Sequence, residues 1–222
     1  MSVVGYWGVH EYSRRSVQRD VEGFVGWGCL MELVEACGSE LEAAFVSALF
    51  LTGGRVGEVL GLRGDMFSVE EEPGVLVVRD MPLSKRYLKL EEKPGGGWET
   101  VSVEAVRRPF PILLCEPPAS ILRNWVERHT GLLFKSPRSV GRPLSRAWAY
   151  KLTQRLEEVT GVGCWPHVFR GWRASQLVSD YGFQVLDLVD FFSWRKVDMA
   201  VHYSRRGWVG LLGRMRPLAR YV

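Results

Sequence analysis

The chain has 222 residues, 46% of them hydrophobic, and a formal net charge of +4 with an isoelectric point near 9.0. This length can bury a sizeable core and favours one domain, and the modest basic excess suits a polyanionic partner without requiring one. No stretch is long and apolar enough for a membrane span, and the first residues lack a secretory signal, so we expect a soluble cytoplasmic protein without membrane contact.

Arginine supplies most of the positive charge, because only six of the 29 basic residues are lysine. A planar guanidinium group can bind phosphate through two hydrogen bonds, so the preference for arginine over lysine fits a phosphate-rich partner. A GC-rich coding sequence is the alternative explanation of this preference. The cysteines form no CxxC pair and lie near no histidine cluster, which indicates free thiols in a reducing compartment. No metal or other cofactor is expected.

The N-terminal half begins with residues 1–25, which mix glycine, aromatic residues and a short basic run and are interpreted as a tail or arm. Apolar residues at helical spacing over 27–50 predict a helix, with a break near Gly38 and Ser39 where a second helix can start. A further short helix is predicted over 56–62.

Residues 66–112 change character and predict strands. The runs GVLVVRD (74–80), RYLKLEE (86–92) and ETVSVEAV (99–106) are rich in β-branched and aromatic residues, and EEPG, MPLSK and KPGGG segments separate them as turns. The interpretation that follows is an antiparallel β-meander.

From Pro117 onward the pattern is helical again. A helix is predicted over 119–129, and another begins at Ser145, a suitable N-cap, and stops at Gly161. Additional helices are predicted from the HVFR segment onward and over 185–192 and 197–205. The expected fold class is therefore α+β, mainly α, with a small antiparallel sheet.

Four residues of the last third stand in an order suited to attack on a phosphodiester: His167, Arg170, Trp194 and Tyr203. His167 and Arg170 are three positions apart, so on a helix they would share one face and reach one ligand together. Arg55 lies far upstream, where two glycines precede it and an apolar periodic run follows.

The segments TGGRVGEVLGLRGD, HVFR and SWRKVDMAVHYSR, in this order, resemble the motifs of the tyrosine recombinases, also called phage-type integrases. The resemblance spans roughly residues 40–206. It implies a catalytic domain that occupies residues 26–222, and the N-terminal core-binding domain, which clamps DNA in that family, has no counterpart in this sequence.

The resemblance also implies a role for each residue. Arg55 and Arg170 would stabilise the negative charge that develops on the phosphate oxygens, and Tyr203 would attack to form a covalent 3′-phosphotyrosyl link. His167 would help to remove the phenolic proton, and Trp194 would brace the phosphate pocket in place of a second histidine. The alternative interpretations are a structural ion pair for Arg55 and plain core packing for Trp194.

In this family a lysine on a β-hairpin protonates the leaving 5′ oxygen. Lys85, Lys89 and Lys93 are the candidates here. Lys85 is favoured because it follows the predicted strand 74–80 at a family-like separation from Arg55. Lys93 is the second choice, since it directly precedes the PGGG turn.

The partner implied by the resemblance is double-stranded DNA, bound by a homotetramer that can be a monomer in solution. Arg146 and Lys151 lie on a helix whose counterpart in the family approaches the DNA groove, so they are candidates for base or phosphate contacts. A solvated helix face is the alternative.

The predicted function is that of a site-specific recombinase or integrase, encoded by a virus, plasmid or chromosome. Two alternatives stay open: a type IB topoisomerase-like enzyme that relaxes DNA with the same chemistry, and a non-catalytic DNA-binding relative.

Overall fold

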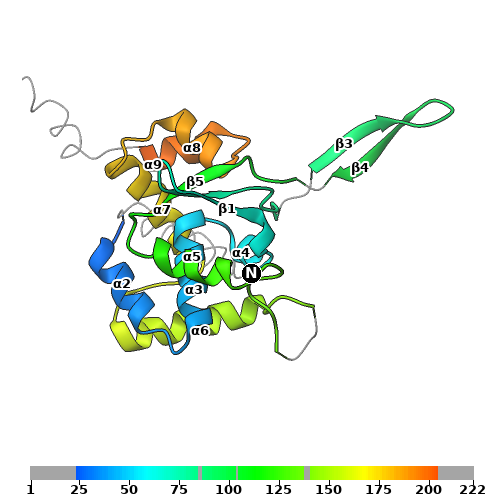
Figure 1. Cartoon of the computed structure of the whole chain (residues 1–222). Coiled ribbons are helices and arrows are strands. Elements are labelled where there is room, and N and C mark those ends of the chain that lie inside the picture. The colour runs from blue at the N-terminus through cyan, green and yellow to red at the C-terminus, as the bar shows by residue number, and fades with distance from the viewer. Residues whose placement is uncertain (1–23, 85–86, 104, 138–140, 205–222) are drawn as a thin grey trace, which may run out of the picture. The chain divides into compact units, whose positions relative to one another are not determined.

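The computed structural model describes residues 24–84, 87–103, 105–137 and 141–204, which fall into two compact units (Figure 1). The larger unit is Val25–Arg173, and the smaller unit contains residues 174–204 together with Phe24. The boundary falls inside one helix, α7 (Val168–Ser179). The expected N-terminal tail lies outside the described residues except for its last two.

Helices dominate the described chain, which confirms the expected mainly α member of the α+β class. The larger unit contains α2 (Trp27–Glu35), α3 (Glu40–Thr52), α4 (Val56–Leu60), α5 (Ala119–Glu127) and α6 (Arg146–Thr160), and the smaller unit contains α8 (Val185–Phe192) and α9 (Val197–Ser204). In the part of the chain that is described, no helix is both long and apolar enough to cross a membrane.

Local capping sets the helix boundaries where the sequence predicted them. The Ser39 hydroxyl accepts a hydrogen bond from the Glu42 N–H at 3.3 Å, and the Ser145 hydroxyl accepts one from the Trp148 N–H at 3.1 Å. Gly161 ends α6 in the left-handed region, at φ 73°. The predicted break between α2 and α3 and both predicted ends of α6 are therefore confirmed.

The core of the larger unit is built around α3. Every residue of this helix from Ala44 to Thr52 is buried, as expected for a helix that is apolar on all sides. It packs against α2, α4 and α5. The ring of Phe45 meets Phe134 and Trp148 edge to face, with centroids 5.1 and 5.0 Å away.

The strands form two separate sheets, so the predicted meander is wrong. One sheet has the antiparallel order β1 (Phe67–Glu70), β2 (Val75–Val78), β5 (Phe110–Leu113), and the other pairs β3 (Tyr87–Glu92) with β4 (Trp98–Val103). Strand β2 finds its second neighbour in β5, about thirty residues along the chain, because their apolar faces complete one buried layer.

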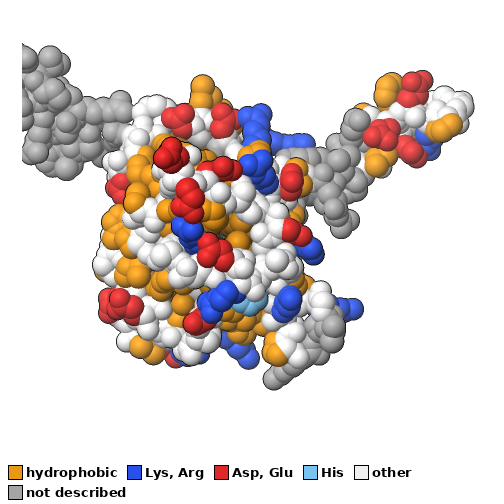
Figure 2. All heavy atoms as spheres, in the orientation of Figure 1, with side chains coloured by type: hydrophobic (Ala, Val, Ile, Leu, Met, Phe, Trp, Pro, Cys, Tyr) orange, Lys and Arg blue, Asp and Glu red, His pale blue; other side chains and the backbone are white. Residues whose placement is uncertain are grey.

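The β3 and β4 strands form a separate long ribbon, which is inserted in the sequence between the paired strands β2 and β5 (Figure 1). Hydrophobic and acidic side chains are visible along it in Figure 2, and Leu90 and Trp98 are 63% and 68% exposed. Glu91 and Glu99 are opposite each other in the ladder, an arrangement of like charges that is unfavourable. The ribbon therefore contributes little to the core.

A buried ion pair fastens α7 to the segment before α5. The Arg173 Nη1 lies 2.6 Å from Glu116 Oε1, and both side chains are at most 2% exposed. The same guanidinium lies over the Phe50 ring, 5.5 Å from its centroid. Removal of one partner would leave the other charge buried without compensation.

We expect Arg173→Met to destabilise the fold by about 3 to 5 kcal/mol in chemical denaturation. The double variant with Glu116→Leu should recover much of this loss, because neither charge is then left buried. The matched control is Arg123→Ala, which breaks the surface pairs with Glu71 and Glu127 and should have a small effect. Equal losses in the single and double variants would contradict the assignment of the penalty to an uncompensated charge.

Candidate active site

The candidate site is built on the sharp turn between α3 and α4. Gly53 caps α3 in the left-handed region at φ 54°, and Gly54 then passes close to Met81 and Val59. A Cβ at Gly54 would lie 2.9 Å from Val59 Cγ2, so no larger residue fits without displacement. The turn places Arg55 at the N-cap position of α4, directly before the helix that the sequence predicted to start at residue 56.

Arg55 is held by Glu58. The Arg55 N–H donates to Glu58 Oε2 and the Arg55 Nη1 to Glu58 Oε1, both at 2.8 Å. The Arg55 side chain is 32% exposed, whereas that of Glu58 is 1% exposed. The buried carboxylate thus orients a guanidinium that still reaches solvent.

Glu58 also binds the base of the inserted ribbon. Its Oε1 accepts a hydrogen bond from the Ser84 N–H at 2.9 Å. Burial by itself would raise the pKa of Glu58, but the N–H donors of Ser84 and Arg55 and the charge of Arg170 outweigh this effect, and its pKa is lowered. The carboxylate is therefore ionised at neutral pH.

Arg170 approaches the same turn from α7. Its guanidinium is buried, and Nη1 donates to the carbonyl oxygen of Gly53 at 2.6 Å. Because Gly53 lies two residues before Arg55, the structure brings the two predicted arginines to one turn of the larger unit.

A third arginine, Arg107, was not predicted. It is 1% exposed, donates from Nη1 to the carbonyl oxygen of Thr52 at 2.6 Å, and lies 3.7 Å above the centroid of the Phe110 ring. Burial first, and then the positive charge of Arg170, lowers the pKa of Arg107, while Glu58 acts in the opposite direction. The sequence signal was a basic pair directly before the apolar run that forms β5.

His167 lies one residue ahead of α7, not within it. Its carbonyl oxygen accepts from the Arg170 N–H at 3.2 Å, while its side chain is exposed and that of Arg170 is buried. His167 therefore stands at the N-terminal boundary of α7, and the placement of both side chains on one helix face stays a prediction.

Trp194 and Tyr203 belong to the smaller unit, where they form an aromatic stack. The Trp194 ring lies 4.5 Å from Phe192 and 5.7 Å from Tyr203 between centroids, with interplanar angles of 14° and 15°. Tyr203 is in α9 and is 8% exposed. His202 meets the Tyr203 ring edge to face at 5.3 Å.

The lysine candidates differ in what the structure describes. Lys85 lies outside the described residues, next to Ser84, and only the backbone of Lys89 is described, within β3. Lys93 is exposed at the tip of the ribbon, where its N–H donates to the Gly97 carbonyl at 2.8 Å.

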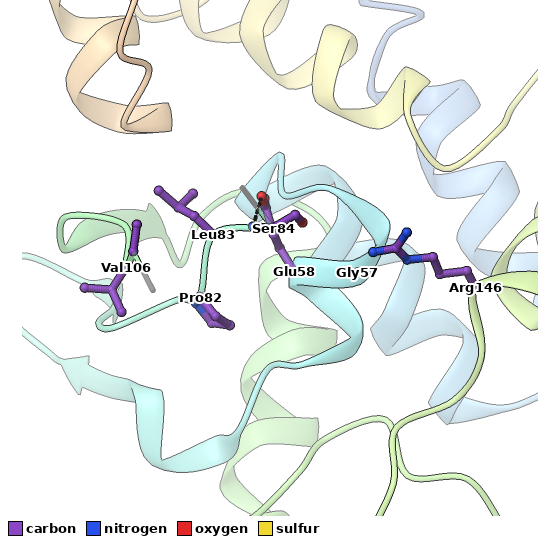
Figure 3. Close-up of a pocket in the computed structure, with 8 residues that line it drawn as sticks. Gly57, Glu58, Pro82, Leu83, Ser84, Val106 and Arg146 are labelled. Atoms are coloured by element: carbon purple, nitrogen blue, oxygen red, sulfur yellow. Dashed lines mark hydrogen bonds between the residues drawn. The ribbon is translucent and has the colours of Figure 1, made fainter. Parts of the chain in front are cut away.

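Arg146 and Lys151 of α6 are both exposed, but they line different hollows. Arg146 borders a cavity of about 280 Å³ together with Gly57, Glu58 and Ser84 (Figure 3). Lys151 borders one of about 570 Å³ that also includes Trp148. Within the described residues, no group of three potential metal ligands lies together.

The fold is similar to that of solved recombinases. XerA recombinase matches with a TM-score of 0.57 at 18% identity, over 87% of this chain and 64% of its own. XerH site-specific recombinase bound to difH matches with a TM-score of 0.55 at 16% identity, over 82% of this chain and 50% of its own. The Tn1549 transposon integrase in complex with circular intermediate DNA matches with a TM-score of 0.55 at 15% identity, over 85% of this chain and 64% of its own. The fold is that of the tyrosine recombinase catalytic domain.

This chain spans about half to two thirds of the length of those recombinases. No protein-family model and no curated protein sequence matches it. The predicted resemblance to tyrosine recombinases is confirmed for the fold.

We expect Glu58→Gln to cost about 3 kcal/mol of stability at neutral pH, because it removes a buried, paired charge. A lowered folded-state pKa contributes stability above the ordinary value of 4.5, and this contribution is lost as the pH falls through the lowered value. The difference in unfolding free energy between wild type and variant should therefore shrink at pH values below 4.5.

The control is Asp65→Asn, which removes the exposed partner of Arg63 and should change stability little at any pH. A wild-type advantage over Glu58→Gln that stays constant down to acidic pH would show that the ionised carboxylate does not provide the stabilisation.

Proposed function

We propose that this chain cleaves and rejoins DNA strands as a site-specific recombinase or integrase. The observation that carries the proposal is the meeting of Arg55 and Arg170 at the Gly53 turn. Two guanidinium groups from distant parts of the sequence create a concentration of positive charge suited to a phosphate. The likeness of fold to recombinases in complex with DNA supports the same conclusion.

In the proposed reaction the Tyr203 oxygen attacks the phosphorus and the bond to the 5′ oxygen breaks. A covalent 3′-phosphotyrosyl link results, and it conserves the energy of the phosphodiester for rejoining. His167 helps to take the phenolic proton, and Arg55 and Arg170 stabilise the charge on the non-bridging oxygens. Trp194 supports Tyr203 through the stacking of the two rings.

The leaving 5′ oxygen receives its proton from Lys85. Support comes from the anchorage of its neighbour Ser84 to Glu58, which also holds Arg55. Lys93 lies at the far end of the six-residue strand β3, roughly 20 Å further along at about 3.3 Å per residue. The base of the ribbon is thus the better place for a group that must reach the same phosphate.

The proposed partner is double-stranded DNA, contacted by Arg146 and Lys151 and bound by a homotetramer. Both side chains are exposed on α6 and border hollows. Arg146 has no hydrogen bond or ion pair with any other described residue, so its charge is available to a phosphate.

The first test uses a nicked suicide substrate. A bound sequence is first selected from random duplexes with the Tyr203→Phe protein, and the nick is placed so that the cleaved fragment diffuses away. We expect the wild type to accumulate a covalent protein–DNA adduct and Tyr203→Phe to form none, because a phenyl ring has no nucleophilic oxygen.

The matched control is Tyr181→Phe, since Tyr181 is another tyrosine of the smaller unit outside α9. An adduct in Tyr203→Phe would refute the assignment of the nucleophile. DNA binding without an adduct in the wild type would favour a non-catalytic DNA-binding protein, and relaxation of plasmids that lack the selected sequence would favour a topoisomerase.

The second test identifies the general acid. A 5′-bridging phosphorothiolate has a sulfur leaving group, which departs without protonation because thiols have a pKa of roughly 8.5, far below that of alcohols. We expect Lys85→Ala to lose at least about 100-fold in cleavage rate on normal DNA and to regain it on the phosphorothiolate. Lys93→Ala should cleave both substrates like the wild type. If the phosphorothiolate rescued Lys93→Ala and not Lys85→Ala, Lys93 would be the general acid.

A further inference from the structure

The two DNA-contact candidates on α6 occupy different surroundings. Lys151 shares its hollow with Arg142 and Trp148, on the side of α6 next to the residues that precede the helix. Arg146, the first residue of the helix, faces α4 and the base of the inserted ribbon. Figure 3 shows its side chain extending toward Gly57. The two residues are thus placed for different contacts.

The approach of Arg146 to α4 depends on a glycine. A Cβ at Gly57 would lie 2.8 Å from Arg146 Nη2 and 3.2 Å from Nε. The guanidinium therefore occupies the space that any other residue at position 57 would fill. Glu58, which holds Arg55, lines the same hollow as Arg146, and this places Arg146 near the proposed cleavage site.

Two charged side chains of the described residues line the hollow, Glu58 and Arg146. Glu58 is the acidic group that lines it, but its carboxylate already accepts three N–H donors from Arg55 and Ser84 and is ion-paired with Arg55. Among the described residues Arg146 makes no ion pair or hydrogen bond, so its charge is not neutralised. The Ser84 side chain lines the same hollow and can donate a hydrogen bond.

We propose that Arg146 binds a DNA backbone phosphate adjacent to the one that is cleaved, and that it reads no base. This inference rests on the proposed function and assigns different tasks to the two α6 residues. Arg146 would fix the position of the strand beside Arg55, whereas Lys151 would act in the separate hollow. A phosphate contact positions the DNA without regard to sequence.

The test measures equilibrium binding in the Tyr203→Phe background, so it does not depend on cleavage. Single phosphates of the selected duplex are replaced one at a time by neutral methylphosphonates. We expect one replacement next to the cleaved position to weaken binding by wild-type Arg146 protein but to leave the affinity of Arg146→Ala unchanged. The slope of log affinity against log salt should fall by about 0.9 in Arg146→Ala, the loss of one phosphate contact.

Two variants make the result specific. Gly57→Ala should displace the Arg146 guanidinium and reproduce the loss of DNA affinity seen in Arg146→Ala. The double variant of Gly57→Ala and Arg146→Ala should bind DNA no more weakly than Arg146→Ala alone. Arg155→Ala removes the same charge from the same helix, but Arg155 is paired with Glu42, so it should keep the wild-type response to each methylphosphonate.

Three outcomes would overturn the proposal. The first is an Arg146→Ala protein that stays sensitive to every methylphosphonate, and the second is one that tolerates base changes which the wild type rejects, since that would indicate base recognition. The third is a Gly57→Ala protein that binds like the wild type. Because binding is measured without the nucleophile, a missing covalent adduct would refute the proposed cleavage, whereas the loss of one methylphosphonate effect in Arg146→Ala would still show the phosphate contact.

Discussion

The buried carboxylate of Glu58 joins two segments of the larger unit. It accepts hydrogen bonds from the backbone and the side chain of Arg55 and from the backbone of Ser84, so it ties the start of α4 to the base of the inserted ribbon. A carboxylate in this position stabilises the structure only while it is ionised and fully hydrogen-bonded. The orientation of Arg55 and the place where the ribbon leaves the larger unit therefore depend on one group.

Around this carboxylate the larger unit gathers more positive than negative charge. Arg107 and Arg170 are buried and donate to the successive carbonyl oxygens of Thr52 and Gly53. Burial first, and then the charge of Arg170, lowers the pKa of Arg107. Such an arrangement needs a rigid frame, which the buried helix α3 and the β5 strand supply.

The smaller unit supports its tyrosine in a different way. Tyr203 is held by parallel stacking on Trp194, which in turn stacks on Phe192 at the end of α8. Ring stacking fixes the plane of the Tyr203 ring. The indole of Trp194 thus forms the middle ring of the stack and joins Tyr203 to the end of α8.

The sequence by itself determined the helices, since their periodicity and their caps at Ser39, Ser145 and Gly161 act within a few residues. The apolar run after Arg55 also predicted a helix that starts at residue 56, directly after this arginine. Only the tertiary structure decided that β2 pairs with β5, that Arg107 lies beneath the turn, and that Arg146 faces α4 while Lys151 does not. These features depend on partners far apart in the chain, such as Thr52 and Arg107, which are 55 positions apart. No local rule specifies which distant group will fill a buried site.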